Sequence, residues 1–206
     1  MTDRSWTVTA SRYVLKDRWI SVRADDCRTP SGTVVAPYYV IESSNAVHVL
    51  AFDETDRAIL VRQYRHPYGG LTLELPGGRI DPGETDPLMA AARELREETG
   101  YGGGTFEAAA ILSVDPPRIA NRTHFVVAHG VIPGKAAPDP SEEIEIVLIP
   151  RDELRALACR GDLVTAAHLG MILLALLRAE ASGGRDKRPG SIKAHKGTTA
   201  GATPRT

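Results

Sequence analysis

The sequence predicts an α+β fold, an α/β/α sandwich in which a mixed β-sheet packs between helices, preceded by a small antiparallel β unit. Short alternating apolar segments predict the strands, which stand in the chain on both sides of one central helix near residues 86–99. A second long helix, predicted for residues 165–181, is dense in apolar residues and contains no proline. Strands interleaved with two or three helices are typical of a sheet with helices on its faces.

Residues 1–44 are predicted to form the small β unit. The segment from Trp6 to Ser43 is strand-like, and part of it is divided by the turn Pro30-Ser31-Gly32, which predicts a hairpin. A hairpin of this size cannot bury a core by itself. We therefore expect it to pack on the next domain or on a second copy of the chain.

Residues 45–181 are predicted to form the main domain. Two apolar runs flank the polar turn at residues 53–56 and predict a second hairpin. The predicted strands of this domain are residues 47–52, 58–64, 71–75, 106–114, 124–131 and 144–149. A short amphipathic helix is expected at residues 152–159, before the long apolar one.

Start and stop signals define the central helix. Thr85 or Asp86 suits the N-cap, Pro87 suits the first helical position, and Gly100 suits a left-handed C-cap. Apolar residues recur on one side of this helix at helical spacing, which predicts the side that faces the sheet. The residues of this predicted stripe are Leu88, Ala92, Leu95 and Thr99.

Glu94, Glu97 and Glu98 cluster on the flank of the helix away from that stripe, so we expect them to be presented to solvent. Carboxylates this close repel one another, and a hard divalent cation would offset the repulsion because it takes oxygen ligands. The preceding turn contains Gly77 and Gly78, which let the main chain approach closely. The alternative is a solvated helix face whose glutamates pair with neighbouring arginines.

The stretch from the glycine turn to the helix end resembles the Nudix box. That motif has Gly, five residues, Glu, seven residues, and then Arg-Glu-aliphatic-x-Glu-Glu-x-Gly. The matching residues are Gly78, Glu84, Arg93, Glu94, Leu95, Glu97, Glu98 and Gly100. One departure stands out, since eight residues separate Glu84 from Arg93. The extra residue makes the pairing of Glu84 with the helix the least secure part of the match.

The resemblance implies hydrolysis of a nucleoside diphosphate linked to another moiety, by attack of water on phosphorus. It implies that Glu94 and Glu98 are the main metal ligands, and that Glu97 binds an additional ion or acts as a base. It further implies that Gly77 supplies a carbonyl ligand and that Arg93 orients the glutamates. The expected cofactor is Mg²⁺, with Mn²⁺ as the alternative.

Flanking residues resemble the ADP-ribose pyrophosphatase branch of that family. The strand Arg62-Gln63-Tyr64-Arg65 and the turn from Glu74 to Gly78 match segments that recur in the branch. Arg62 or Arg65 is then expected to contact phosphate, with an ion pair to Glu74 as the alternative. Glu74 is itself a candidate substrate contact. The resemblance also implies a homodimer whose N-terminal unit helps hold the adenosine, for which Tyr38 is a candidate.

Two later loops add candidate residues. Arg122 matches a loop arginine of the branch, whereas Asn121 stands where an acidic residue is usual. The branch often supplies a catalytic glutamate from a later loop, and here residues 138–145 contain Glu142 and Glu143. A carboxylate within reach of the attacking water can serve as general base. The sequence does not choose between the two, and solvation in the loop is the alternative for either.

The expected function is metal-dependent hydrolysis of ADP-ribose or a related ADP-sugar, giving AMP and a sugar phosphate. The alternatives are another nucleotide sugar or nucleoside diphosphate derivative, such as GDP-mannose or NADH, or a non-catalytic nucleotide-sensing module.

Composition limits the other partners. The formal net charge of -1 argues against a protein that coats nucleic acid. Residues 182–206 carry six Lys and Arg against one Asp and few apolar residues, which predicts a disordered basic tail with at most a weak nucleic-acid contact. The longest apolar run, Leu169 to Leu177, is about half of a bilayer span. Without a secretory signal at the N-terminus, we expect a cytoplasmic protein without membrane contact.

Overall fold

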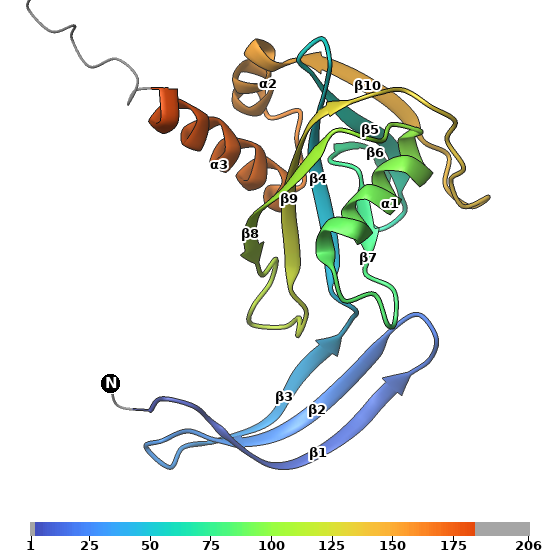
Figure 1. Cartoon of the computed structure of the whole chain (residues 1–206). Helices are drawn as coiled ribbons and strands as arrows, with labels where there is room; N and C mark the ends of the chain where they lie inside the picture. The colour runs from blue at the N-terminus through green and yellow to red at the C-terminus, as the bar shows by residue number, and fades with distance from the viewer. Residues whose placement is uncertain (1–2, 184–206) are drawn as a thin grey trace, which may run out of the picture.

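The computed structural model describes residues 3–183, with side chains to residue 181, and it contains two β-sheets and three α-helices (Figure 1). A small sheet has the strand order β1-β2-β3, and a seven-stranded sheet has the order β10-β5-β4-β9-β8, with β6 on β5 and β7 on β4. In the larger sheet β4 and β9 run parallel, whereas the other pairs are antiparallel. The predicted α+β class with a mixed sheet is confirmed.

The N-terminal sheet is antiparallel throughout and extends away from the helices (Figure 1). Its strands are β1 (Thr7–Lys16), β2 (Ser21–Arg28) and β3 (Val34–Glu42). Asp25 on its middle strand is 3% exposed and pairs with Arg23, which also binds Glu42. The Arg23–Glu42 ion pair therefore links β2 to β3, in addition to the backbone pairing of the two strands.

The larger sheet forms from the strands predicted for residues 45–149, together with one very short strand. Its members are β4 (Ala46–Asp53), β5 (Arg57–Arg65), β6 (Gly70–Glu74), β7 (Gly77–Arg79), β8 (Thr105–Leu112), β9 (Thr123–Val131) and β10 (Glu145–Pro150). The short strand, β7, arises because the glycine turn pairs with the first residues of β4. This pairing fixes where the turn lies on the sheet.

Helices cover the two faces of the larger sheet. On one face α1 (Pro87–Thr99) packs on Val47 and Val49, and on the other α2 (Leu154–Arg160) and α3 (Ala166–Gly183) pack on Leu50. A short 3-10 turn, η1 (Arg151–Glu153), leads into α2. Successive β4 residues alternate between the two cores because side chains of a strand point to opposite faces.

The ends of α1 follow the local signals. The Asp86 side chain accepts the Leu88 N–H at 2.9 Å, so Asp86 and not Thr85 is the N-cap. Gly100 ends the helix with φ 76°, and its N–H donates to the Arg96 carbonyl. The predicted bounds of this helix are confirmed.

The buried side of α1 differs from the predicted stripe. Leu95 and Thr99 are buried as expected, but Ala90 and Ala91 are also buried, whereas Leu88 is only partly buried. The buried face is thereby rotated, and it includes Glu98. The expectation that all three glutamates are presented to solvent is wrong for Glu98.

Within the described residues, no helix is both long and apolar enough to span a membrane. The predicted division of the chain at residues 44 and 45 falls between β3 and β4, and it stays a prediction. From residue 184 onward the predicted basic tail lies outside the described residues.

Leu95 should anchor α1 to the sheet, because its side chain is 0% exposed. We expect Leu95→Ala to lower the stability by about 2–5 kcal/mol. In a chain of this size that corresponds to a fall in Tm of about 5–15 °C. Thermal unfolding measures it, with Met89→Ala, on the same helix and 64% exposed, as the control. Equal losses in the two variants would contradict this packing.

Candidate active site

The glycine turn is the first component of the candidate site. The chain leaves β6 at Glu74 and enters β7 at Gly77, which pairs with His48 of β4. Gly77 has φ 151°, and a Cβ there would stand 2.1 Å from the Val47 carbonyl oxygen. Only glycine allows this approach, so the residue type fixes the position of the turn.

Gly78 lies against the carboxylate of Glu94. A Cβ at Gly78 would come within 2.7 Å of both carboxylate oxygens of Glu94. The second glycine therefore leaves the space that the helix carboxylate occupies. Burial raises the pKa of Glu94, while Arg93 opposes that shift and Glu97 and Glu142 add to it.

Glu98 is the most buried of the three α1 glutamates, at 6% exposed. Its Oε2 accepts the Gly77 N–H at 2.9 Å, which joins the helix directly to the turn. Burial raises the pKa of Glu98 to about 8; the Gly77 hydrogen bond opposes the rise, and the charges of Glu142 and Glu94 strengthen it. A carboxylate in this position gains from a nearby positive charge.

Arg93 organises the remaining acidic groups. Its guanidinium contacts Glu84 at 3.1 Å, Glu94 at 2.9 Å and Glu97 at 3.0 Å. It also donates to the Arg79 carbonyl of β7 at 3.1 Å. The pairing of Glu84 with the helix thus forms despite the extra residue, because residues 85 and 86 precede the first turn. The Arg93 guanidinium lowers the pKa of Glu84.

The carboxylates fit a hard divalent cation by their chemistry. Oxygen-only donor sets suit Mg²⁺ and Mn²⁺. The pKa values of Glu94 and Glu98 are raised first by burial and then by neighbouring carboxylates, and a bound cation would offset both effects. Within residues 3–183, no three Asp, Glu, His or Cys side chains already converge as metal ligands. The oxygens point instead to Arg93 and to the Gly77 N–H, so binding requires these side chains to turn.

Arg65 lies beside the acidic cluster and is held by a buried acid. Its guanidinium makes two hydrogen bonds to Glu74, at 2.9 and 2.8 Å. Glu74 is 5% exposed and also accepts from the Thr72 hydroxyl. The Glu74 bond raises the pKa of Arg65, and the charges of Glu98 and Glu142 add to it. The predicted ion pair of Arg65 and Glu74 therefore forms next to the glutamates of α1.

The two loop glutamates are not equivalent. Glu142 lies close enough for its charge to raise the pKa values of Glu94 and Glu98. Glu143 is not among the main causes of the pKa shifts of Arg65, Glu94 and Glu98. The loop thus brings Glu142 toward the cluster.

Three other predicted contacts lie elsewhere. Arg62 pairs with Glu145 at 2.9 Å and lines a hollow beside α2, on the opposite face of the sheet from Arg65. Arg122 donates to the Asn121 carbonyl at 3.1 Å, near the start of β9. The Tyr38 hydroxyl donates to the Pro117 carbonyl at 2.5 Å. The structure shows no contact between these three side chains and the acidic cluster.

Sequence reasoning missed Thr72, His48 and His168. Thr72 could have been found, because it lies two residues before Glu74 and so shares its face of β6. His168 comes from α3 and accepts the Leu75 N–H at 3.2 Å across 93 residues of chain. No local sequence pattern predicts a contact between residues so far apart in the chain.

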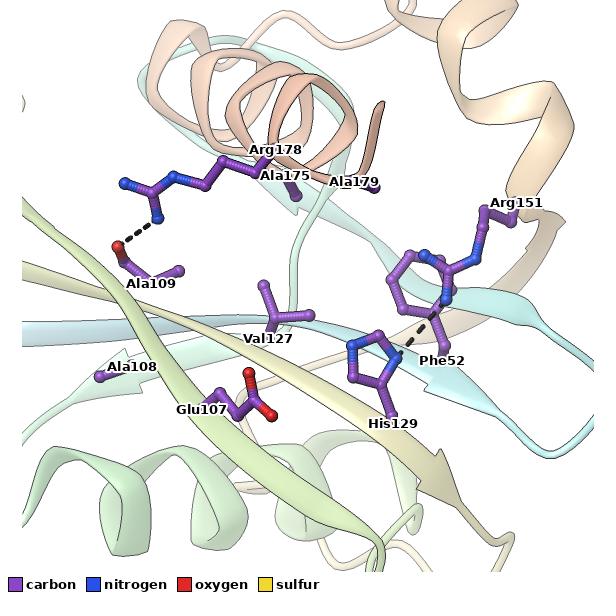
Figure 2. A pocket seen from close by; sticks show the side chains of 10 residues that line it. All are labelled: Phe52, Glu107, Ala108, Ala109, Val127, His129, Arg151, Ala175, Arg178 and Ala179. Atoms are coloured by element: carbon purple, nitrogen blue, oxygen red, sulfur yellow. Dashed lines mark hydrogen bonds between the residues drawn. The ribbon is translucent and has the colours of Figure 1, made fainter. Parts of the chain in front are cut away.

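A separate hollow of about 310 Å³ lies between the sheet and α3 (Figure 2). Its arginines are engaged, since Arg178 donates to the Ala109 carbonyl and Arg151 binds Asp56 while stacking on Phe52. Glu107 is the one carboxylate among its lining residues. The hollow therefore lacks the paired acids that distinguish the face of α1.

Comparisons with known proteins agree with this geometry. Residues 43–166 match the family model described as NUDIX domain, and residues 6–41 match that of the nucleoside diphosphate sugar hydrolase N-terminal domain. The chain is 28% identical to an ADP-ribose pyrophosphatase of Mycobacterium tuberculosis, over 84% of each chain. It is 31% identical to an ADP-sugar pyrophosphatase of Mus musculus, over 71% of this chain and 74% of the relative.

A solved structure of an ADP compounds hydrolase superimposes with a TM-score of 0.79 at 25% identity. The superposition covers 89% of this chain and 98% of the other. The matched region thus includes both the small N-terminal sheet and the larger domain.

Burial of Glu98 predicts a pH-dependent stability difference. The folded pKa of Glu98, about 8, lies above the ordinary 4.5. The free energy of unfolding that Glu98 contributes therefore falls as the pH rises from 4.5 to 8. In EDTA we expect Glu98→Gln to lie close to the wild type near pH 5 and to gain about 10 °C in Tm near pH 8. Scanning calorimetry measures the gap, with Glu143→Gln as the exposed control. A gap that does not change with pH would contradict this burial.

The space beside Gly78 predicts a second effect. Gly78→Ala would force the flexible Glu94 carboxylate aside, so we expect Mn²⁺ affinity to fall about 10-fold while the fold survives. Calorimetric titration with Mn²⁺ measures the affinity. Gly102→Ala is the control, because a Cβ there meets no atom within 4 Å. Unchanged affinity in Gly78→Ala would separate Glu94 from the metal site.

Proposed function

The chain belongs to the Nudix family, and on this premise we propose that it hydrolyses the pyrophosphate of ADP-ribose or a related ADP-sugar. The products would be AMP and a sugar phosphate. As a Nudix pyrophosphohydrolase it acts on an anhydride between two phosphoryl groups, and water attacks one phosphorus. The observation that carries the proposal is the pair of carboxylates against the glycine turn, buried Glu98 and partly buried Glu94.

The α1 glutamates would hold the cation. Nudix hydrolases generally need a divalent metal, and we propose Mg²⁺, with Glu94, Glu98 and the Gly77 carbonyl as its ligands. Glu97 would bind an additional ion or act as a base. When bound, the ion would activate water and neutralise charge on the phosphates. Arg93 would keep Glu94 and Glu97 oriented through its paired hydrogen bonds. With the ion bound, Arg93 would keep its contacts to Glu84 and to the Arg79 carbonyl.

Glu142 and Arg65 would complete the reaction site. Glu142 would accept the proton of the attacking water, because its carboxylate lies near the α1 glutamates. Glu143 is the weaker candidate for this role. Arg65 would contact a phosphate, since its guanidinium keeps further donors beyond the two that bind Glu74.

The N-terminal sheet would mediate a homodimer. All ten residues of β1 are exposed, including Val8 at 53% and Val14 at 53%. The β1–β2 connection adds Trp19 at 66%, and β3 adds Tyr39 at 54%. Such a large apolar surface is typical of an interaction site. Tyr38, which belongs to β3, and Arg122, which directly precedes β9, would contact substrate only through such an assembly. Arg62 would take no part.

Asn121 keeps the alternative substrates open. This residue is 8% exposed and donates to the Ser44 carbonyl at 3.3 Å, so it has a structural role where the branch usually has an acid. Other nucleotide sugars or NADH therefore belong in the test. The expected cytoplasmic location stays a prediction.

A substrate panel tests the proposal. Purified protein with Mg²⁺ is offered ADP-ribose, other nucleotide sugars including GDP-mannose, NADH, dinucleoside polyphosphates and dNTPs. We expect AMP to be released fastest from ADP-ribose or another ADP-sugar, and we expect Glu98→Gln to lose most of the rate. Absence of metal-dependent turnover of every compound would overturn the proposal in favour of a nucleotide-sensing module.

Glu142 and Glu143 form a matched pair for mutation. We expect Glu142→Gln to lower kcat by about 10²–10⁴-fold, the usual contribution of a general base. Glu143→Gln should change kcat less than about 3-fold, since a solvated loop carboxylate contributes little. Steady-state kinetics on the best panel substrate measures both. Equal losses, or a larger loss in Glu143→Gln, would assign the base differently.

Sedimentation equilibrium tests the homodimer. We expect a species of about twice the 22.2 kDa chain mass at micromolar concentration. Val14→Glu, which places a charge on exposed β1, should weaken the association. A wild-type protein that sediments only as a monomer would contradict the proposed assembly.

A further inference from the structure

Hydrogen bonds from separate elements hold the backbone of the glycine turn. The Pro76 carbonyl accepts the Val49 N–H of β4 at 2.9 Å, and the Gly77 N–H donates to Glu98 of α1. The remaining bond, at Leu75, goes to His168 of α3. The turn is therefore tied to both faces of the sheet.

The backbone N–H of Leu75 requires an acceptor from outside β6. The strand ends at Glu74, so the Leu75 N–H lies beyond its ladder, and the residue is 1% exposed. A buried N–H without an acceptor destabilises the fold, because it loses its hydrogen bond to water. The Nδ1 atom of His168 supplies that acceptor at 3.2 Å.

His168 stands on an otherwise apolar side of α3. Met171 and Ile172 follow it at helical spacing and are both 0% exposed, whereas His168 is 3% exposed. Burial lowers the pKa of His168 to about 4, so its ring is neutral at pH 7 with Nδ1 as acceptor and the proton on Nε2. An apolar residue of similar size would fill the same space but would leave the Leu75 N–H unpaired.

His48 of β4 lies beside His168 and the glycine turn. Its ring lies 4.3 Å from the His168 ring, and its Nδ1 is 2.8 Å from the point where a Cβ of Gly77 would stand. That Nδ1 is buried and has no hydrogen-bond partner in the described part of the chain. Two imidazoles thus fill the space directly behind the turn.

We propose that His168 is a positioning residue, which acts through Leu75 to hold the glycine turn in register with the carboxylates of α1. Without that hydrogen bond the turn would keep its bonds to β4 and α1, but its first residue could move. The Gly77 carbonyl and the space beside Gly78 would then be less well aligned with Glu94 and Glu98. This inference rests on the proposed function, in which the turn supplies part of the metal site.

Two substitutions separate positioning from packing. His168→Leu keeps an apolar side chain and removes the acceptor, whereas His168→Asn offers Oδ1 in the place of Nδ1. Met171→Leu is the control for repacking of α3 at a fully buried position. Mn²⁺ affinity without substrate is measured by calorimetry, and kcat, KM and the Mg²⁺ activation constant are measured on the best panel substrate.

We expect His168→Leu to weaken Mn²⁺ binding about 10–100-fold, with His168→Asn within about 3-fold of the wild type. The Mg²⁺ activation constant should rise in parallel while the substrate KM changes little. An active wild type with unaltered Mn²⁺ affinity in His168→Leu overturns this inference alone. A wild type that binds no Mn²⁺ and hydrolyses none of the panel overturns the proposed function and this inference with it.

Amide hydrogen exchange of the wild type covers the case in which His168→Leu does not fold. We expect the Leu75 amide to be protected as strongly as the amides of the central strand β4. Exchange at the rate of an exposed loop would show that the His168 bond does not hold the turn, and would overturn the proposal without any variant.

Discussion

The contact between the glycine turn and the glutamates of α1 is the constraint on which the rest of the site depends. The turn must pass close to the helix, which requires Gly77 beside the Val47 carbonyl and Gly78 beside Glu94. The helix must bury Glu98 to reach the Gly77 N–H, and this raises the pKa of the carboxylate. The site is thus built at a cost in stability that a bound cation would offset.

The larger sheet positions both sides of this contact, because it binds the glycine turn and α1 separately. Pairing of β7 with β4 fixes the turn, and Leu95 fixes α1 on the same face. Arg93 then bridges helix and strand through the Arg79 carbonyl. Support from α3 reaches the turn from the other face, so the acidic cluster depends on elements that are distant in sequence.

Local sequence signals predict much of the fold and of the candidate site. The bounds of α1 follow from Asp86, Pro87 and Gly100, and strand alternation separates Arg65 from Arg62, a signal that the sequence contains. The burial of Glu98 could not be predicted, because small residues such as Ala90 leave the buried side of the helix ambiguous. Only the tertiary position of β7 decides that side. The role of His168 likewise depends on a contact across 93 residues.

The central claim is that the carboxylates of α1 and the glycine turn together hold a divalent cation. Anomalous diffraction from crystals grown with Mn²⁺ tests it most directly, because the metal is located without reference to activity. The account predicts a peak bounded by the carboxylates of Glu94 and Glu98 and by the Gly77 carbonyl. A peak elsewhere on the molecule, with none between α1 and the turn, would contradict it.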